Sequence, residues 1–269
     1  MKIGIISLGL IGGSLFKNLT QTENEIYAVT RNEATISQAI SLSPYVSNDL
    51  NTLKDCDIIF VASPINKTLE ILDKLNNIAK KDCIVLDCAS VKQFVMNKNY
   101  NYTFIGSHPM AGTENNGYNS SFKELFEGAK WVLTPDEKTS QDKIDKVKAL
   151  IENTGATVII ADAKEHDKAV ALISHMPLLL SQALFNTVKD NPLAIKLASS
   201  GFRDMTRLTM SNLEMAKDMR EYNFENINNA LNQLNKSIDE LKTSQDAEIF
   251  KNLKELRQKM YSVDGKNIV

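Results

Sequence analysis

The stretch KIGIISLGLIGGSLF, residues 2–16, joins a short β-rich run to a glycine-rich turn and the start of an amphipathic helix. The turn, Ser7–Ser14, is close to the Gly-x-Gly-x-x-Gly pattern. In that pattern one glycine makes the tight turn, the second lets the backbone approach a pyrophosphate, and the third brings helix and strand together. Ser7 stands where the first glycine is usual. This strand–turn–helix succession predicts the first unit of a nucleotide-binding α/β fold.

The helix after the turn carries its apolar residues Leu15, Phe16 and Leu19 on one side. The free N–H groups of its first turn and the positive end of its dipole would face an anion. We therefore expect a dinucleotide site rather than a purely structural turn. The expected cofactor contacts are Gly9, Leu10, Ile11 and Gly12.

Short β-rich runs alternate with helical patterns over residues 1–160, and from about Ala161 the strand signal disappears. This alternation predicts an α/β fold: an N-terminal Rossmann-type, mostly parallel sheet with helices on both faces, over 1–160. An all-helical C-terminal domain is expected over 161–269. The candidate strands are Ile3–Ile6, Glu25–Val29, Ile58–Ala62, Ile84–Leu86, Phe104–Gly106, Trp131–Leu133 and Thr157–Ile160.

The composition is that of an ordinary globular protein, since 43% of the 269 residues are hydrophobic and 24% are charged. A formal net charge of -2 favours neither nucleic acid nor an anionic membrane surface as a partner. The three cysteines show no metal-ligand spacing, and a reducing cytoplasm is the expected location. The apolar stretch Ala169–Phe185 contains several polar residues, and we expect a buried helix there rather than a membrane span.

The second candidate strand ends at Val29 and is followed by Thr30 and Arg31, where an NAD-selective site normally has an acidic residue. A hydroxyl and a cation suit a 2′-phosphate, so NADP is the expected cofactor. Alternatively, Arg31 stacks on adenine or points to water, and NAD is then used. Ser63 and Pro64, after the third long candidate strand, are further expected cofactor contacts.

One of the three histidines, His108, lies between small and turn-forming residues in Gly106–Gly112. An imidazole on a loop at the end of a strand is placed to take a proton from a substrate, because its ordinary pKa is near neutrality. A hydrogen-bonded structural histidine is the alternative. We expect a loop here and a base at His108.

Further motifs accompany the glycine turn and the histidine segment HPMAGTE, residues 108–114: DCASVK at 87–92, His166-Asp167 with SHMP at 174–177, and GFRDMTR at 201–207. Together, and in this order, they resemble the prephenate and arogenate dehydrogenases of tyrosine biosynthesis. The resemblance spans essentially the whole chain. It implies a Rossmann domain that binds NAD(P) and a helical domain for substrate binding and dimerisation, with a homodimer as the expected assembly.

The resemblance also implies an oxidative decarboxylation of a small cyclohexadienol, in which hydride passes from C4 to the nicotinamide and the ring carboxylate leaves as carbon dioxide. His108 matches the catalytic histidine, which takes the proton of the C4 hydroxyl. Ser90 matches a serine that orients this imidazole and contacts the substrate; an N-cap of a helix beginning near Val91 is the alternative role.

Arg207 matches the arginine that binds a substrate carboxylate, which a guanidinium can hold bidentately. Arg203 could assist, but a surface ion pair with Asp204 or Glu214 is the other interpretation. Glu114 matches a glutamate near the site entrance and is expected to bind or orient substrate.

The remaining histidines, His166 and His175, are interpreted as structural, because their spacing does not put them on one helical face and no third ligand is near; no metal is expected. Many prephenate-preferring relatives read Leu-Pro-His after the serine-histidine pair, whereas this chain has Met176-Pro177-Leu178. Prephenate is the first expectation for the substrate. Arogenate, or use of both, is the alternative.

A heptad-like seam of apolar residues runs late in the chain, and it packs either on its own domain or on a second subunit. A different class of function, a non-catalytic NADP-binding sensor, would need the glycine turn but not the combination of His108, Ser90 and Arg207. A β-hydroxyacid dehydrogenase would share the layout but would not explain the histidine segment. The seam consists of Phe224, Ile227, Leu231, Leu234, Ile238 and Leu241.

Overall fold

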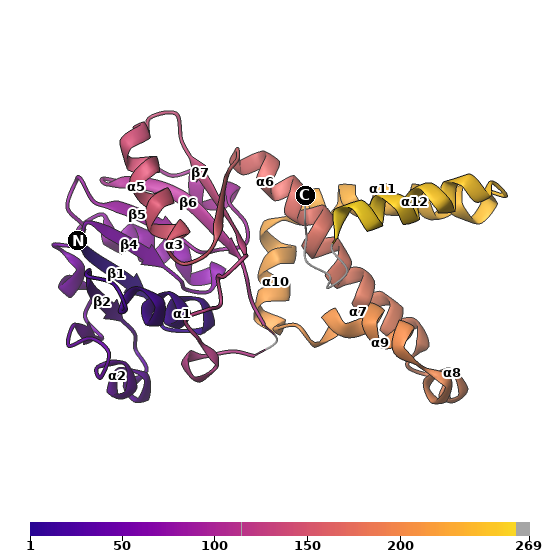
Figure 1. Ribbon diagram of the computed structural model, residues 1–269, viewed down its shortest axis with the longest axis horizontal. Coiled ribbons are helices and arrows are strands. Elements are labelled where there is room, and N and C mark those ends of the chain that lie inside the picture. The colour runs from indigo at the N-terminus through magenta and orange to yellow at the C-terminus, as the bar shows by residue number, and fades with distance from the viewer. Residues whose placement is uncertain (114, 262–269) are drawn as a thin grey trace. The chain divides into compact units, whose positions relative to one another are not determined.

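The computed structural model describes residues 1–113 and 115–261. The chain divides into two compact units, Met1–Ile227 and Asn228–Val269. The first unit contains the whole sheet and the helices up to α10 (Figure 1). The expected boundary between residues 160 and 161 falls inside this unit and stays a prediction.

An eight-stranded sheet has the order β3-β2-β1-β4-β5-β6-β7-β8. Every neighbouring pair is parallel except β6 and β7, which are antiparallel. The predicted Rossmann-type, mostly parallel sheet is therefore confirmed. The strands are β1 (Lys2–Ile6), β2 (Glu25–Val29), β3 (Val46–Ser47), β4 (Ile58–Val61), β5 (Ile84–Asp87), β6 (Thr103–Met110), β7 (Lys130–Pro135) and β8 (Thr157–Ile160).

The central strand β1 shows why the sheet is covered on both faces. Its alternate residues enter different cores: Ile5 packs with Phe16 of α1, whereas Ile6 packs with Leu72 of α3 on the other face. A continuous apolar run of this kind is typical of a strand between two helical layers. The helices of this part are α1 (Leu10–Leu19), α2 (Glu33–Ala39), α3 (Ile65–Leu75), α4 (Gln93–Met96) and α5 (Gln141–Glu152).

From the end of β8 to Met260 the secondary structure is helical, as expected. Helix α10 contacts the sheet-bearing part, because Asn66 at the start of α3 donates to Glu214 and the Phe94 ring lies 4.7 Å from that of Tyr222. These helices are α6 (Ala163–Val170), α7 (Met176–Val188), α8 (Pro192–Leu197), α9 (Ser200–Thr206), α10 (Leu213–Tyr222), α11 (Phe224–Thr243) and α12 (Ala247–Met260).

A π turn, Ala171–His175, joins α6 to α7 in one continuous helix over residues 163–188. Pro177 is the second residue of α7. Its ring has no N–H and would crowd a carbonyl one turn earlier, which the wider turn accommodates. By length and composition alone this helix could cross a membrane, which is weak evidence. The expectation of a buried helix is wrong for much of it, since Ile173 is 64% exposed.

The second unit, residues 228–269, contains most of α11 and all of α12. Asp246 caps α12 by accepting the Glu248 N–H at 2.9 Å. Ile249, Phe250 and Leu253 repeat at helical spacing and are exposed on α12. Of the expected seam, Ile227 is buried within the first unit and Ile238 is 42% exposed in the second.

Candidate active site

The glycine turn lies between β1 and α1, next to the end of β4. Gly9 is the N-cap of α1, and a Cβ built on it would meet nothing within 4 Å, which leaves open space for a ligand against the backbone. The first intrahelical bond runs from the Gly13 N–H to the Gly9 carbonyl at 2.9 Å, so the N–H groups before it are free for an anion. These features fit the pyrophosphate of a dinucleotide.

Two other residues of the turn explain its departure from the usual pattern. Ser7 has a φ of 71°, so the position of the missing first glycine does have a left-handed conformation. A Cβ at Gly12 would lie 2.0 Å from the Ser7 carbonyl oxygen and 3.0 Å from the Ala62 Cβ. Gly12 is therefore the glycine required for close helix–strand packing.

The other expected cofactor residues lie at the carboxyl ends of β2 and β4, on either side of β1. Arg31 is exposed and makes no ion pair within the described residues, while Asn32 caps α2 by accepting the Thr35 N–H at 3.0 Å. Thr30 is partly buried beside it. Ligands of open α/β sheets bind at such a point, where the strand order reverses.

Ser63 and Pro64 begin the turn into α3. The Ser63 hydroxyl is buried and lies 3.1 Å from that of Thr68, so it is already engaged within its own turn. Pro64 is exposed as the N-cap of α3. Of these two residues, exposed Pro64 is therefore better placed to contact a cofactor than the Ser63 hydroxyl.

His108 lies within β6 and not on a loop, which corrects the expected strand end at Gly106. The strand continues to Met110 because β7 pairs with it antiparallel, with His108 opposite Val132. The parallel pairing with β5 stops at Ile105. His108 therefore extends beyond the end of β5 at the carboxyl edge of the sheet, held by one strand only.

A buried ion pair supports this extension of β6. Lys92 and Asp87 are fully buried, and the Lys92 ammonium contacts the Asp87 carboxylate and donates to the Ser107 carbonyl at 2.6 Å. The Ser107 N–H in turn donates to the other Asp87 oxygen at 2.9 Å. The backbone next to His108 is thus fixed by charge-assisted hydrogen bonds.

The imidazole of His108 is bonded to a second histidine. His108 Nδ1 lies 2.9 Å from His166 Nε2, and His166 Nδ1 lies 2.8 Å from the Asp167 carboxylate. Asp167 also accepts the backbone N–H groups of Lys92 at 2.7 Å and Gln93 at 2.9 Å. Sequence reasoning treated His166 as structural and missed this chain, whose partners lie far apart in sequence.

Charge and burial keep the His108 imidazole neutral. Burial holds the pKa of His108 well below its usual value, and His166, Lys92 and His175 add to this effect in that order. Its Nε2 makes no hydrogen bond within the described residues, while the residue itself is partly exposed. A neutral imidazole with one free nitrogen at an accessible edge is suited to accept a proton.

Ser90 does not cap a helix, so that alternative is wrong: α4 begins at Gln93 with Lys92 as its N-cap. The Ser90 hydroxyl oxygen is buried without a hydrogen-bond partner in the described part of the chain. Nothing there joins it to His108, whose Nδ1 is oriented by His166 instead. A buried hydroxyl without a partner costs free energy, which a bound ligand would recover.

Arg207 begins the short 3₁₀ turn Arg207–Met210 after α9 and is exposed, without an ion pair among the described residues. The turn is anchored to α7, since the Thr209 N–H donates to the Ser181 hydroxyl at 3.0 Å. Arg203 pairs with Asp204 at 3.1 Å, as the alternative interpretation predicted. No described contact joins Arg207 to His108, and Glu114 lies outside the described residues.

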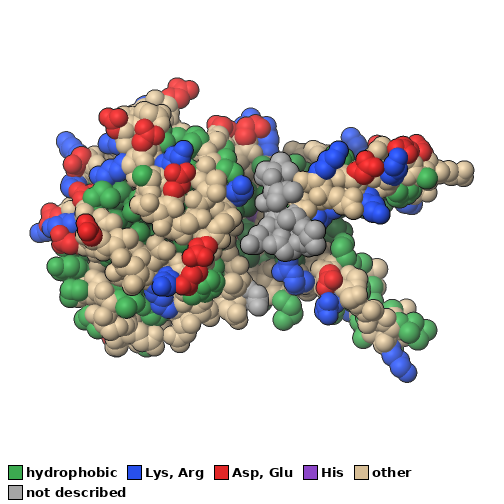
Figure 2. All heavy atoms as spheres, in the orientation of Figure 1, with side chains coloured by type: hydrophobic (Ala, Val, Ile, Leu, Met, Phe, Trp, Pro, Cys, Tyr) green, Lys and Arg blue, Asp and Glu red, His purple; other side chains and the backbone are tan. Residues whose placement is uncertain are grey.

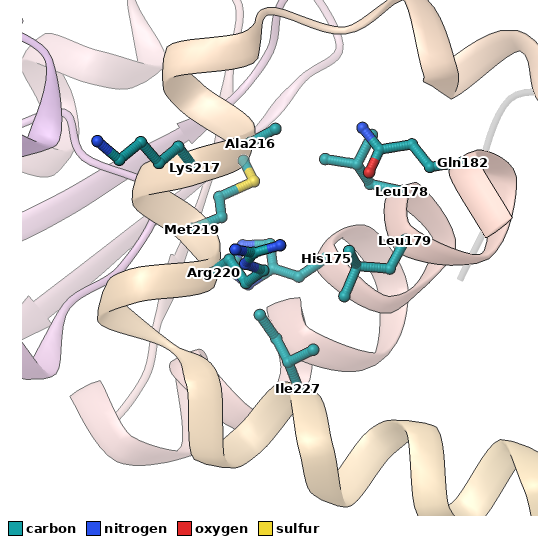
Figure 3. A pocket seen from close by; sticks show the side chains of 9 residues that line it. All are labelled: His175, Leu178, Leu179, Gln182, Ala216, Lys217, Met219, Arg220 and Ile227. Carbon is teal, nitrogen blue, oxygen red and sulfur yellow. The ribbon is translucent and has the colours of Figure 1, made fainter. Parts of the chain in front are cut away.

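A cavity of about 200 Å³ lies between α7 and α10 (Figure 3). His175 closes one side of it; burial lowers the pKa of this histidine to about 4, and its Nδ1 faces the Asn223 amide at 3.1 Å. Lys217 and Arg220 lie on the α10 side. His108 does not line this cavity. The described residues contain no cluster of three or more metal-ligating side chains.

Comparison with known proteins finds similarity to one family over most of the chain. Residues 16–160 match the model of the prephenate dehydrogenase nucleotide-binding domain, and residues 162–259 match that of the prephenate dehydrogenase dimerization domain. A prephenate dehydrogenase of Lactococcus lactis is 30% identical over 96% of this chain and 77% of its own length.

Solved structures agree with this. The Synechocystis arogenate dehydrogenase has a TM-score of 0.83 at 34% identity, with 96% of each chain covered. The Aquifex aeolicus prephenate dehydrogenase, in complex with hydroxyphenyl propionate and NAD+, has a TM-score of 0.83 at 29% identity, again with 96% of each chain covered. The similarity extends over both the sheet and the helices that follow it.

Proposed function

Because this chain belongs to the prephenate dehydrogenase family, we propose that it converts prephenate to 4-hydroxyphenylpyruvate by oxidative decarboxylation, with hydride transfer to NAD(P), in tyrosine biosynthesis. The observation that carries the proposal is the neutral His108 imidazole, whose Nε2 has no partner among the described residues, at the carboxyl edge of the sheet. The glycine turn between β1 and α1 lies at the same edge, so cofactor and base face one region.

In the proposed reaction, His108 Nε2 accepts the proton of the C4 hydroxyl. Bound NAD(P) supplies the chemistry of a hydride acceptor for C4. As the ring carboxylate leaves as carbon dioxide, its bonding electrons make the ring aromatic, and the proton on His108 returns to the resulting phenolate oxygen. The reaction therefore releases no net proton, and the low pKa of His108 favours this return.

Two further side chains are assigned to the substrate. Ser90 carries a buried hydroxyl that has no partner in the part of the chain that the structure describes, and it would donate to the C4 oxygen or to a carboxylate. Arg207 is an unpaired cation within the described residues and would bind a substrate carboxylate bidentately. Glu114 keeps its proposed role in orienting substrate at the entrance.

We propose NADP as the preferred cofactor, supported by the exposed Arg31 after β2. Its guanidinium suits a 2′-phosphate, and the neighbouring Thr30 offers a hydroxyl instead of the carboxylate that favours NAD. NAD remains the alternative. The NAD+ complex of the A. aeolicus relative shows which cofactor that protein binds.

A homodimer through the helical segment is part of the proposal. The segment that matches a dimerization domain carries large exposed apolar side chains, including Ile173, Leu197 and Leu213. A second copy would cover such side chains.

Acidic and basic groups are interspersed over the face shown in Figure 2, which fits a small-molecule enzyme rather than a binder of nucleic acid or membranes. The cytoplasm is the proposed location.

Arogenate dehydrogenase, or a dual cyclohexadienyl dehydrogenase, is the second candidate. Leu178 stands where many prephenate-preferring relatives have histidine, and the Synechocystis relative of 34% identity is an arogenate dehydrogenase. A turnover assay that crosses prephenate and arogenate with NAD and NADP, followed as reduced nicotinamide, separates these possibilities. Turnover of prephenate with NADP above the other pairs supports the proposal.

The same assay tests the third candidate. Cofactor binding without turnover of either dienol would reject the enzyme and favour a non-catalytic NADP-binding sensor. Faster turnover of arogenate would replace the substrate and leave the chemistry in place.

A further inference from the structure

We propose that His166 and Asp167 are positioning residues for the reaction proposed above. They hold His108 in the one tautomer that leaves a lone pair on Nε2 for the substrate. This inference rests on the proposed function. It assigns roles to two residues that do not contact the reacting atoms.

Asp167, His166 and His108 form a hydrogen-bond chain, and the position of each proton in it follows from the Asp167 end. Asp167 accepts two backbone N–H groups and lies against His166 Nδ1 at 2.8 Å, so this carboxylate acts as an acceptor throughout. His166 Nδ1 must then carry a proton, and in the neutral form of this imidazole Nε2 is unprotonated. That nitrogen faces His108 Nδ1 at 2.9 Å and can only accept.

His108 Nδ1 therefore carries the proton of this second bond. In a neutral His108 the other nitrogen, Nε2, has its lone pair free, which is the form a base requires. With His166 unchanged, the opposite tautomer of His108 would place the lone pair of its Nδ1 against the lone pair of His166 Nε2. In this hydrogen-bond chain His166 Nδ1 therefore donates to the Asp167 carboxylate, and His108 Nδ1 donates to His166 Nε2.

The anchor of the chain is rigid. Asp167 is 1% exposed and His166 is 4% exposed. The two N–H groups on Asp167 come from Lys92 and Gln93 at the start of α4, and Asn223 donates to the Asp167 carbonyl at 2.8 Å. The helical segment therefore aligns an imidazole of the sheet through a carboxylate that cannot rotate without losing backbone bonds.

Asp167→Asn separates this role from packing, because both amide orientations are unfavourable. With the amide oxygen toward His166, the NH₂ group meets the Gln93 N–H; with the NH₂ group toward His166, it also meets the Lys92 N–H. The second orientation reverses donor and acceptor in both bonds of the hydrogen-bond chain and puts a proton on His108 Nε2. We expect kcat to fall about 10²-fold or more, within the range of general-base effects.

His166 offers a matched pair of variants. His166→Phe keeps a planar ring but offers no acceptor, whereas His166→Gln keeps an amide oxygen that can accept from His108. We expect Phe to lower kcat about 10²-fold with less than about 3-fold change in KM, and Gln to recover about tenfold. Asp162→Ala is the control, because the Asp162 side chain caps α6 by accepting the Lys164 and Glu165 N–H groups and makes no described hydrogen bond to His108, His166 or Asp167. The substitution keeps the Asp162 carbonyl, which accepts the His166 N–H at 2.8 Å.

The control should lower stability through the lost cap and leave kcat within about 2-fold. Loss of activity in His166→Phe equal to that in Asp162→Ala would overturn the proposal. Recovery by Gln no better than Phe would also count against it.

Nitrogen-15 NMR of the imidazoles tests the tautomer without turnover. The chain has only three histidines, so substitution of each assigns the spectrum. We expect neutral His108 with protonated Nδ1 in the wild type and with a proton shifted to Nε2 in Asp167→Asn. A wild-type His108 protonated at Nε2 overturns the inference, whereas absence of turnover in a protein with the expected tautomer rejects only the proposed function.

Discussion

Lys92→Met removes one partner of the most deeply buried ion pair among the described residues. The side chains of Lys92 and Asp87 are both 0% exposed, and methionine keeps the apolar stem but loses the ammonium. Asp87 then retains hydrogen bonds from the Ser107 N–H at 2.9 Å and the Ala89 N–H at 3.0 Å. These do not balance its charge.

Removing one partner of a buried pair typically costs about 3–5 kcal/mol, because an uncompensated charge stays in a medium of low polarity. The lost bond to the Ser107 carbonyl is part of that loss. Lys74→Met is the matched control: its pair with Glu70 spans 2.8 Å, but both side chains are more than half exposed, so little loss of stability is expected.

Urea unfolding of the two variants, followed by circular dichroism, gives the comparison. We expect the free energy of unfolding to fall about 3–5 kcal/mol in Lys92→Met and to change little in Lys74→Met. Adding Asp87→Asn should restore part of the loss, because the stranded charge is then gone. Losses of equal size in the two single variants would refute the argument from burial.

Three other predictions concern the cofactor turn, cofactor choice and pH. Gly12→Ala should weaken dinucleotide binding at least tenfold by calorimetry, since its Cβ would lie 2.0 Å from the Ser7 carbonyl oxygen; unchanged affinity would contradict this close packing. Arg31→Asp should shift the kcat/KM ratio from NADP toward NAD, and an unshifted ratio would reject the role of Arg31. Burial lowers the pKa of His175 from 6.5 to about 4. Between these two pH values the unfolded protein binds a proton that the native protein does not, so the free energy of unfolding falls by roughly 3 kcal/mol as the pH drops from 6.5 to 4. Unfolding measured at pH 7 and pH 4.5 should show a smaller loss in His175→Gln than in wild type, and equal losses would contradict this.

Local patterns predicted the fold well. The run from β1 through Gly12 contains its own turn and helix signals, so the nucleotide-binding unit could be recognised without long-range information. Parallel strands such as β4 and β5 are buried apolar runs and were equally visible. The two-residue β3 was missed because so short a run has no detectable period.

The candidate site was less predictable because its geometry depends on distant pairings. His108 was placed on a loop, since only the antiparallel pairing with β7 extends β6 past Gly106. The role of His166 depends on a contact between two residues far apart in the chain, and the motif His166-Asp167 does not indicate that His108 is its partner. Asp87, at the end of a buried strand, and Lys92 were visible as charges in an apolar context, which is the one clue that could have been followed.

His108→Asn gives the most direct test of the central claim that this imidazole is the base of a prephenate-family dehydrogenase. The measurement is kcat with saturating dienol and cofactor, alongside the dissociation constant of the cofactor. We predict a fall in kcat of about 10²- to 10⁴-fold with unchanged cofactor affinity and an intact fold. Near-normal turnover in this variant would contradict the account.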